Sequence, residues 1–121
     1  MKKVISTTNA PAAIGPYSQA IEVNGMVFAS GQIPVNPATG EIPEGIEAQA
    51  EQVMKNVGEI LKEAGCGYED VVKTTCFLAE MADFGAFNAV YEKYFTGKPA
   101  RSCVAVKTLP KNVLCEVEVI A

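Results

Sequence analysis

Two charged residues near the carboxyl-terminal end of the chain have the chemistry of a candidate site. Alternation along the predicted strand Val113–Ile120 places Glu116 on one face, opposite valine and cysteine side chains that belong in a core. We expect that face to carry no helix, and the same reasoning places Arg101 and Cys103 on it beside Glu116. A carboxylate partly desolvated at such a position could act as a base that activates water.

Arg101 has two interpretations at this stage. In the first, it forms a structural ion pair with Glu116, which the pattern alone favours because charged groups at interfaces are often structural. In the second, its planar guanidinium binds a substrate carboxylate through two oxygens, and Glu116 activates the attacking water. Both interpretations put the two side chains close together.

The composition excludes several other chemistries. The 121 residues include no His, which excludes a Ser-His-Asp triad, a Cys-His dyad and imidazole metal ligands. A net charge of −4 argues against nucleic acid and anionic membrane surfaces as partners, and no apolar run is long enough to span a bilayer. The four cysteines are widely spaced, without a CxxC pair or an export signal before them. We therefore expect reduced thiols and a cytoplasmic protein.

Five residues are weaker signals taken singly. Tyr17 is expected to be a loop aromatic that packs over a sheet edge, and Ser30-Gly31 a bulge or a point where a ligand approaches the backbone. Asn88 is expected on a helix surface. Cys103 has the character of a small buried residue whose backbone matters more than its sulfur.

The length and the 49% hydrophobic content predict a single domain over residues 1–121. Apolar residues at three- and four-residue steps predict a helix over Ile46–Ala64, ended by Gly65, and a second helix follows Asp83 as far as Phe95. Asn24-Gly25 predicts a type I′ hairpin turn. The predicted strands are Lys3–Ser6, Gln19–Val23, Met26–Gln32, Val71–Leu78, Arg101–Val106 and Val113–Ile120.

This order of elements contains two strand-helix-strand units. Right-handed crossovers put both helices on one face of a single sheet, which defines an α+β fold. The other face of the sheet then lacks a covering layer. An uncovered face with apolar side chains calls for a second chain, so we expect an oligomer.

Four segments together resemble a known family. They are Ala13–Ala20 (AIGPYSQA), Ser30–Pro34 (SGQIP), Pro99–Ser102 (PARS) and Leu109–Val117 (LPKNVLCEV). In this order and spacing they are similar to the Rid family of YjgF-like proteins, in particular its reactive intermediate (2-iminobutanoate/2-iminopropanoate) deaminase A branch. The resemblance covers nearly the whole chain.

The resemblance implies a chorismate-mutase-like fold, with a six-stranded mixed sheet and two helices on one face. It implies a homotrimer with a central barrel of sheets and sites between subunits. It also implies an enamine/imine deaminase without cofactor or metal, which protects the cell by hydrolysing reactive 2-imino acids to 2-oxo acids and ammonia. Arg101 would bind the substrate carboxylate and Glu116 would position or activate water. The rest of the pocket would comprise Tyr17, Ser30, Gly31, Asn88 and Cys103.

Two alternatives remain open. The first is a non-enzymatic module in which the Arg101 pocket binds a 2-oxo acid or the surface of the oligomer engages another protein. The second, also associated with the family, is an RNA-cleaving translation inhibitor, against which the acidic balance and the absence of His weigh.

Overall fold

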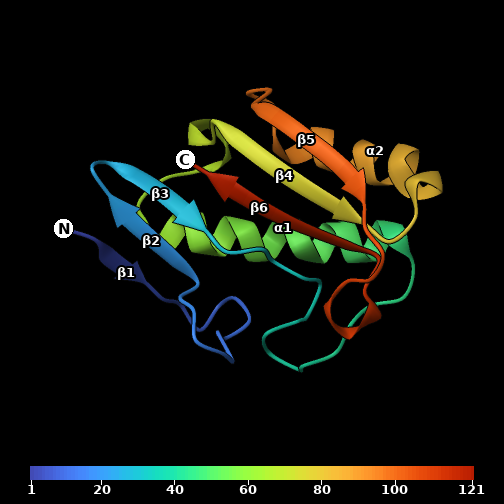
Figure 1. The fold of residues 1–121 in the computed structure, drawn as a ribbon, viewed down its shortest axis with the longest axis horizontal. Coiled ribbons are helices and arrows are strands. Elements are labelled where there is room, and N and C mark those ends of the chain that lie inside the picture. Colours follow the sequence, from blue (N-terminus) through green and yellow to red (C-terminus); the bar gives the residue numbers. More distant parts are fainter.

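A computed structural model describes all residues, 1–121, and contains one six-stranded sheet (Figure 1). The strand order is β1-β2-β3-β6-β4-β5, in which β4 and β5 are parallel and the other neighbours antiparallel. The strands are β1 (Lys3–Ile5), β2 (Ala20–Val23), β3 (Met26–Ala29), β4 (Lys73–Leu78), β5 (Ala100–Ala105) and β6 (Cys115–Ile120). The predicted mixed sheet is confirmed.

Both helices lie on the same side of the sheet, behind it in the view of Figure 1. They are α1 (Ile46–Glu63) and α2 (Phe84–Tyr94). Helix α1 buries one stripe of side chains at the predicted spacing, including Val53, Met54, Val57 and Leu61. Burial of each such side chain contributes about 1.5–3 kcal/mol. The core also includes Phe87 and Val90 of α2, Cys76 and Leu78 of β4, and Cys115, Val117 and Val119 of β6.

Turn and cap residues explain where several elements end. Asn24 and Gly25 have φ of 52° and 76°, the positive pair that a type I′ turn requires, so the predicted hairpin is confirmed. Gly65 has φ of 84° and ends α1. Asp83 precedes α2 as predicted, but its side chain makes no capping hydrogen bond, because its backbone is already helical at the end of a short 3₁₀ turn.

The third strand is shorter than predicted. It ends at Ala29, and after Ser30-Gly31 the chain pairs again only at Gln32, whose N–H donates to the Val117 carbonyl at 2.8 Å. The Val117 N–H donates back to the Gln32 carbonyl at 3.1 Å. The break therefore falls at the glycine, as expected of a bulge.

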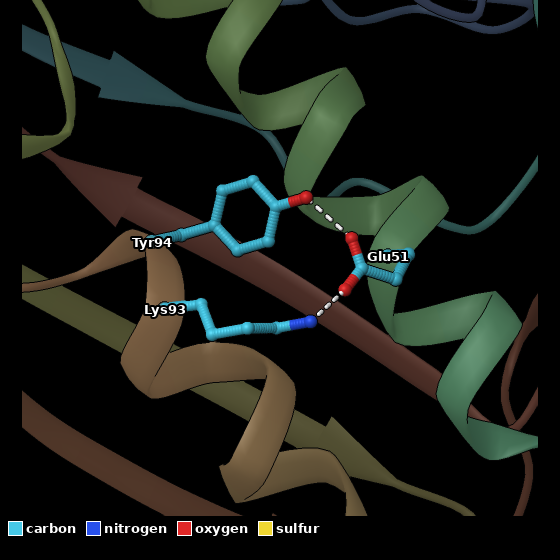
Figure 2. A network of polar contacts seen from close by, with 3 residues as sticks. All are labelled: Glu51, Lys93 and Tyr94. Carbon is cyan, nitrogen blue, oxygen red and sulfur yellow. Dashed lines mark hydrogen bonds and ion pairs between the residues drawn. The ribbon is translucent and has the colours of Figure 1, made fainter.

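The two helices are joined by a polar contact at their exposed side (Figure 2). Glu51 of α1 accepts hydrogen bonds from the Lys93 Nζ at 2.5 Å and from the Tyr94 hydroxyl, both on α2. These two hydrogen bonds lower the pKa of Glu51, and the bond from Lys93 has the larger effect. The bond to Glu51 and burial raise the pKa of Tyr94 to about 12. Neither helix is long and apolar enough to cross a membrane.

The opposite side of the sheet, which we call the open face, has no helix over it. Register places Phe28, Phe77, Val104, Glu116, Glu118 and Ile120 there. Phe28 is 43% exposed and Val104 46% exposed. The uncovered face predicted from the order of elements is confirmed.

Candidate functional site

On the open face, Glu116 lies directly over Gly31. A Cβ added to Gly31 would overlap the Glu116 Oε2 and lie 2.8 Å from its carboxyl carbon. No side chain larger than hydrogen therefore fits at Gly31 while Glu116 keeps this position. Burial, and then the neighbouring Glu118, raise the pKa of Glu116. The carboxylate is thus held against backbone in a partly desolvated place.

Loop 6–19 is tied to the hairpin beside this carboxylate. The Ser30 hydroxyl donates to the Ser18 carbonyl at 2.7 Å, so its side chain is already used in holding the loop. The buried Gln19 side chain accepts from the Thr7 N–H at 2.7 Å and donates to the Pro11 carbonyl at 2.7 Å. These bonds fix the base of the loop that carries Tyr17.

Tyr17 and Gly31 line the same small cavity. The cavity has a volume of about 200 Å³, and its walls include Ile14, Tyr17, Gly31, Ile33 and Lys111. Tyr17 is 53% exposed and Ile14 is 81% exposed, so in a single chain the loop exposes these large side chains to solvent. Tyr17, Gly31 and Glu116 therefore form one group on this part of the surface.

Arg101 lies on the other face of the sheet, so its predicted place beside Glu116 is wrong. Arg101 pairs in register with Thr74, which is fully buried under the helices, while Glu116 pairs with Phe77 on the open face. Cys103 likewise pairs with the buried Cys76 on the helix side. The sequence of β5 does not show which of its side chains face the helices, because β5 is an edge strand with both faces partly exposed and has no apolar alternation.

The guanidinium of Arg101 is oriented by α2. Its Nη1 donates to the Asn88 Oδ1 at 2.6 Å, and its Cζ lies 4.6 Å from the ring centroid of Tyr91 and 5.4 Å from that of Phe84. The Tyr91 hydroxyl is hydrogen-bonded to the Thr74 hydroxyl at 2.8 Å, which fixes that ring. Amide and aromatic faces therefore hold the cation without neutralising its charge.

Arg101 has no carboxylate partner within the chain. The one ion pair joins Lys93 to Glu51, so the predicted Arg101–Glu116 pair is absent. Arg101 borders an open surface pocket of about 430 Å³ together with Asn88, Tyr91 and Lys98. Its remaining guanidinium donors are available to an anion that enters this pocket.

The predicted site residues thus fall into two groups. Arg101, Asn88 and Cys103 lie on the helix side of the β5 edge, and Tyr17, Gly31 and Glu116 lie on or beside the open face. One chain does not bring the two groups together. No cluster of three or more His, Cys, Asp or Glu side chains is placed to hold a metal ion.

The structure adds residues that the sequence did not single out for the site. Phe84 and Tyr91 flank Arg101, and Thr74 fixes Tyr91. The spacing of Phe84, Asn88 and Tyr91 by four and three residues is a signal that they share one face of a helix. That this helix face contacts Arg101 follows only from the pairing of β5 with β4, which puts Arg101 on the helix side of the sheet.

Comparison with known proteins identifies the family. The family model described as Endoribonuclease L-PSP matches residues 7–121. The 2-iminobutanoate/2-iminopropanoate deaminase of Escherichia coli K12 is 52% identical over 125 residues, covering 100% of this chain and 98% of the relative. The putative regulator AldR of Lactococcus lactis is 60% identical over 121 residues, covering 98% and 96%.

A solved structure agrees with these sequence relatives. The YjgF gene product of Escherichia coli superimposes with a TM-score of 0.95 and 51% identity, covering 98% of this chain and 97% of that one. The chain belongs to the Endoribonuclease L-PSP family, which is the YjgF-like Rid family that its motifs resemble. The family predicted from the four segments is confirmed.

Proposed function

We propose that this protein is an imine deaminase, which hydrolyses 2-imino acids such as 2-iminobutanoate and 2-iminopropanoate to 2-oxo acids and ammonia. The observation that carries the proposal is Arg101, a guanidinium oriented by Asn88 and Tyr91, bordering a pocket and lacking any carboxylate partner in its own chain. A planar cation held in this way suits a substrate carboxylate. Relatives named as deaminases at about 52% identity support the same activity.

The complete site in this proposal is made by two chains of a homotrimer. One subunit supplies Arg101 and Asn88 and the backbone at Cys103, and its neighbour supplies Glu116, Gly31 and Tyr17. Three features support this arrangement: the two groups occupy different faces of the sheet, the open face exposes Phe28 and Val104, and Glu116 has no cation beside it in one chain. An exposed apolar face of this kind is typical of a subunit interface.

The chemistry needs little more than orientation. The substrate carboxylate binds Arg101, which places the electrophilic imine carbon near a water held by Glu116. Glu116 accepts a proton as the water adds to the C=N carbon, and ammonia leaves from the tetrahedral adduct as the C=O bond forms. The raised pKa of Glu116, caused first by burial, makes it a stronger base than an exposed carboxylate. General base catalysis contributes about 10²-fold or more, and orientation contributes most of the remainder.

The other residues have supporting roles in this proposal. Gly31 allows Glu116 to lie against the backbone, Ser30 fixes the loop through Ser18, and Tyr17 covers the cavity beside Gly31. None of the steps requires a cofactor. A cytoplasmic location is part of the proposal.

Two other activities make different predictions. A non-enzymatic module would bind a 2-oxo acid at Arg101 without turning over an imine. Cleavage of RNA is suggested by the description of the family model, but a net charge of −4 and the absence of His do not favour a phosphodiester substrate. A genuine ribonuclease would retain its activity through purification and lose it when Arg101 is replaced.

The test is turnover of an imine generated in place. A dehydratase acting on threonine supplies 2-iminobutanoate, semicarbazide traps the imine that survives, and the parent is compared with Arg101→Ala. The matched control is Lys107→Ala, which removes an exposed cation just beyond β5. We expect the parent and the Lys107 variant to lower trapping and Arg101→Ala to have no effect. Equal activity of Arg101→Ala, or an inactive parent that is folded and oligomeric, would refute the proposal.

A further inference from the structure

A pair of cysteines lies next to the Arg101 pocket. Cys76 of β4 and Cys103 of β5 are register partners on adjacent parallel strands, and both side chains point to the helix side. Neighbouring strands are about 4.7–4.9 Å apart, which falls within the Cα separation of about 4.4–6.8 Å that disulfides require. No pattern in the sequence indicates this pair, because Cys76 and Cys103 are far apart along the chain and follow no CxxC pattern.

The two thiols differ in access. Cys76 is fully buried, whereas Cys103 lies on an edge strand and is only partly buried. An oxidant from solvent therefore reaches Cys103 first. Cys76, the buried register partner, can then react with the oxidised Cys103. We propose that Cys76 and Cys103 form a modification site, a dithiol that hydrogen peroxide converts to a reversible disulfide.

Oxidation of the two thiols to a disulfide consumes one hydrogen peroxide and no other reactant. The Cys103 sulfur attacks one peroxide oxygen, so that an S–O bond forms, the O–O bond breaks and one water leaves with the thiol proton. The Cys76 sulfur then attacks the Cys103 sulfur, the S–S bond forms as the S–O bond breaks, and the departing hydroxide takes the Cys76 proton and leaves as a second water. The two thiols lose two electrons, and one peroxide is reduced to two waters.

The surroundings set the rate and the reversibility. Burial, followed by the nearby Cys103, raises the pKa of Cys76 to about 12. Burial also raises the pKa of Cys103, against the opposing effect of the Arg101 cation. Oxidation is therefore slow at neutral pH and accelerates as the pH rises. Strand β5 is an edge strand that pairs with β4 alone and Cys103 is only partly buried, so a thiol reductant can reach the Cys103 sulfur from solvent and reverse the oxidation.

The other cysteines are poorer partners. Cys115 is fully buried and pairs with Leu78, so it lies diagonal to Cys76 and is not its register partner. Cys66 lies just beyond α1, directly after the turn formed by Ala64 and Gly65. A disulfide at Cys103 should therefore form with Cys76 alone.

The test uses peroxide, alkylation in denaturant, and peptide mapping by mass spectrometry. We expect the parent to lose two hydrogen atoms, to yield a Cys76–Cys103 linked peptide, and to regain both thiols with dithiothreitol. Cys76→Ala should give no internal bond and should instead add oxygen at Cys103. Cys115→Ala, the matched buried control, should form the bond as the parent does. If Cys76→Ala fails to fold, Cys103→Ala at the edge strand removes the same bond.

Three results would overturn the proposal. They are a bond to Cys66 or Cys115, addition of oxygen to Cys103 of the parent without a linked peptide, and loss of the bond in Cys115→Ala. The bond is measured by mass and does not depend on the proposed deaminase activity. Where that activity is also present, it should fall on oxidation and return on reduction, because Cys103 lies two residues from Arg101 on the same face.

Discussion

The carboxylate of Glu116 occupies the space that a side chain at Gly31 would need. Gly31 lies in a break of the sheet beside β6, because β3 ends at Ala29 and pairing with β6 resumes at Gln32. The gap lets Glu116 lie on bare backbone, where burial raises its pKa. A break in the sheet ladder and the placement of a candidate base thus have a common cause.

The first prediction concerns Gly31→Ala. The added methyl group displaces Glu116, so imine hydrolysis should fall by about 10²-fold, the usual contribution of a general base. The control is Gly85→Ala in α2, where an added Cβ meets nothing within 4 Å. That variant should keep full activity and melt at the same or a slightly higher temperature. Full activity of a folded Gly31→Ala protein would show that the position of Glu116 is not important.

The second prediction concerns the pH profile. Glu118 raises the pKa of Glu116, after the larger effect of burial. The acid limb of kcat/KM should therefore move to lower pH in Glu118→Gln, which removes this neighbouring charge. Profiles of the two proteins, recorded at constant ionic strength, check this. An unchanged or upward-shifted limb would mean that another group controls the reaction.

The third prediction concerns stability at Gly58 of α1. A Cβ there would lie 2.8 Å from the Tyr68 ring carbon that bears the hydroxyl, and this hydroxyl donates to the Met54 carbonyl at 2.6 Å. Gly58→Ala should therefore destabilise the protein by about 1–3 kcal/mol, despite the better helix propensity of Ala. Denaturant unfolding measures this. In the double variant, Tyr68→Phe should recover part of the stability that Gly58→Ala loses. If the double variant loses the sum of the two single losses, the steric explanation is contradicted.

The fourth prediction concerns Glu51, which joins the two helices. Its pKa is lowered in the folded state by the bonds from Lys93 and Tyr94, so its contribution to stability is present above the unfolded pKa and is lost as the pH falls through the folded pKa. Glu51→Gln should be less stable than the parent at pH 7, and the difference should shrink below pH 4.5. A difference that is constant with pH would show that the ion pair does not contribute.

The parts of the fold that were predicted correctly carry their signal locally. The α1 stripe repeats every three or four residues, Asn24-Gly25 specifies its own turn, and β6 alternates cleanly between valine or cysteine and glutamate. Each of these patterns can be recognised within a short stretch of sequence, without knowledge of distant contacts. These features defined the layers of the molecule and the uncovered face.

Which side chains of β5 face the helices could not be predicted in the same way. Its residues Arg-Ser-Cys-Val-Ala lie at a sheet edge, where neither face is fully buried, so hydrophobicity does not say which side Arg101 takes. Only pairing with β4, a non-local contact, decides it. The same contact brings Cys103 beside Cys76. The candidate residues were identified, but their division between two faces required the sheet register.

That division makes the central claim testable by mixing two inactive proteins. Arg101→Ala and Glu116→Gln should each abolish imine hydrolysis. If the site joins Arg101 of one chain to Glu116 of its neighbour, trimers refolded from an equal mixture contain intact sites. Random assembly should restore about one quarter of the parent activity, because each site draws its two chains independently. Activity that stays at the level of the separate variants, in mixed trimers verified by mass, would contradict a site shared between subunits.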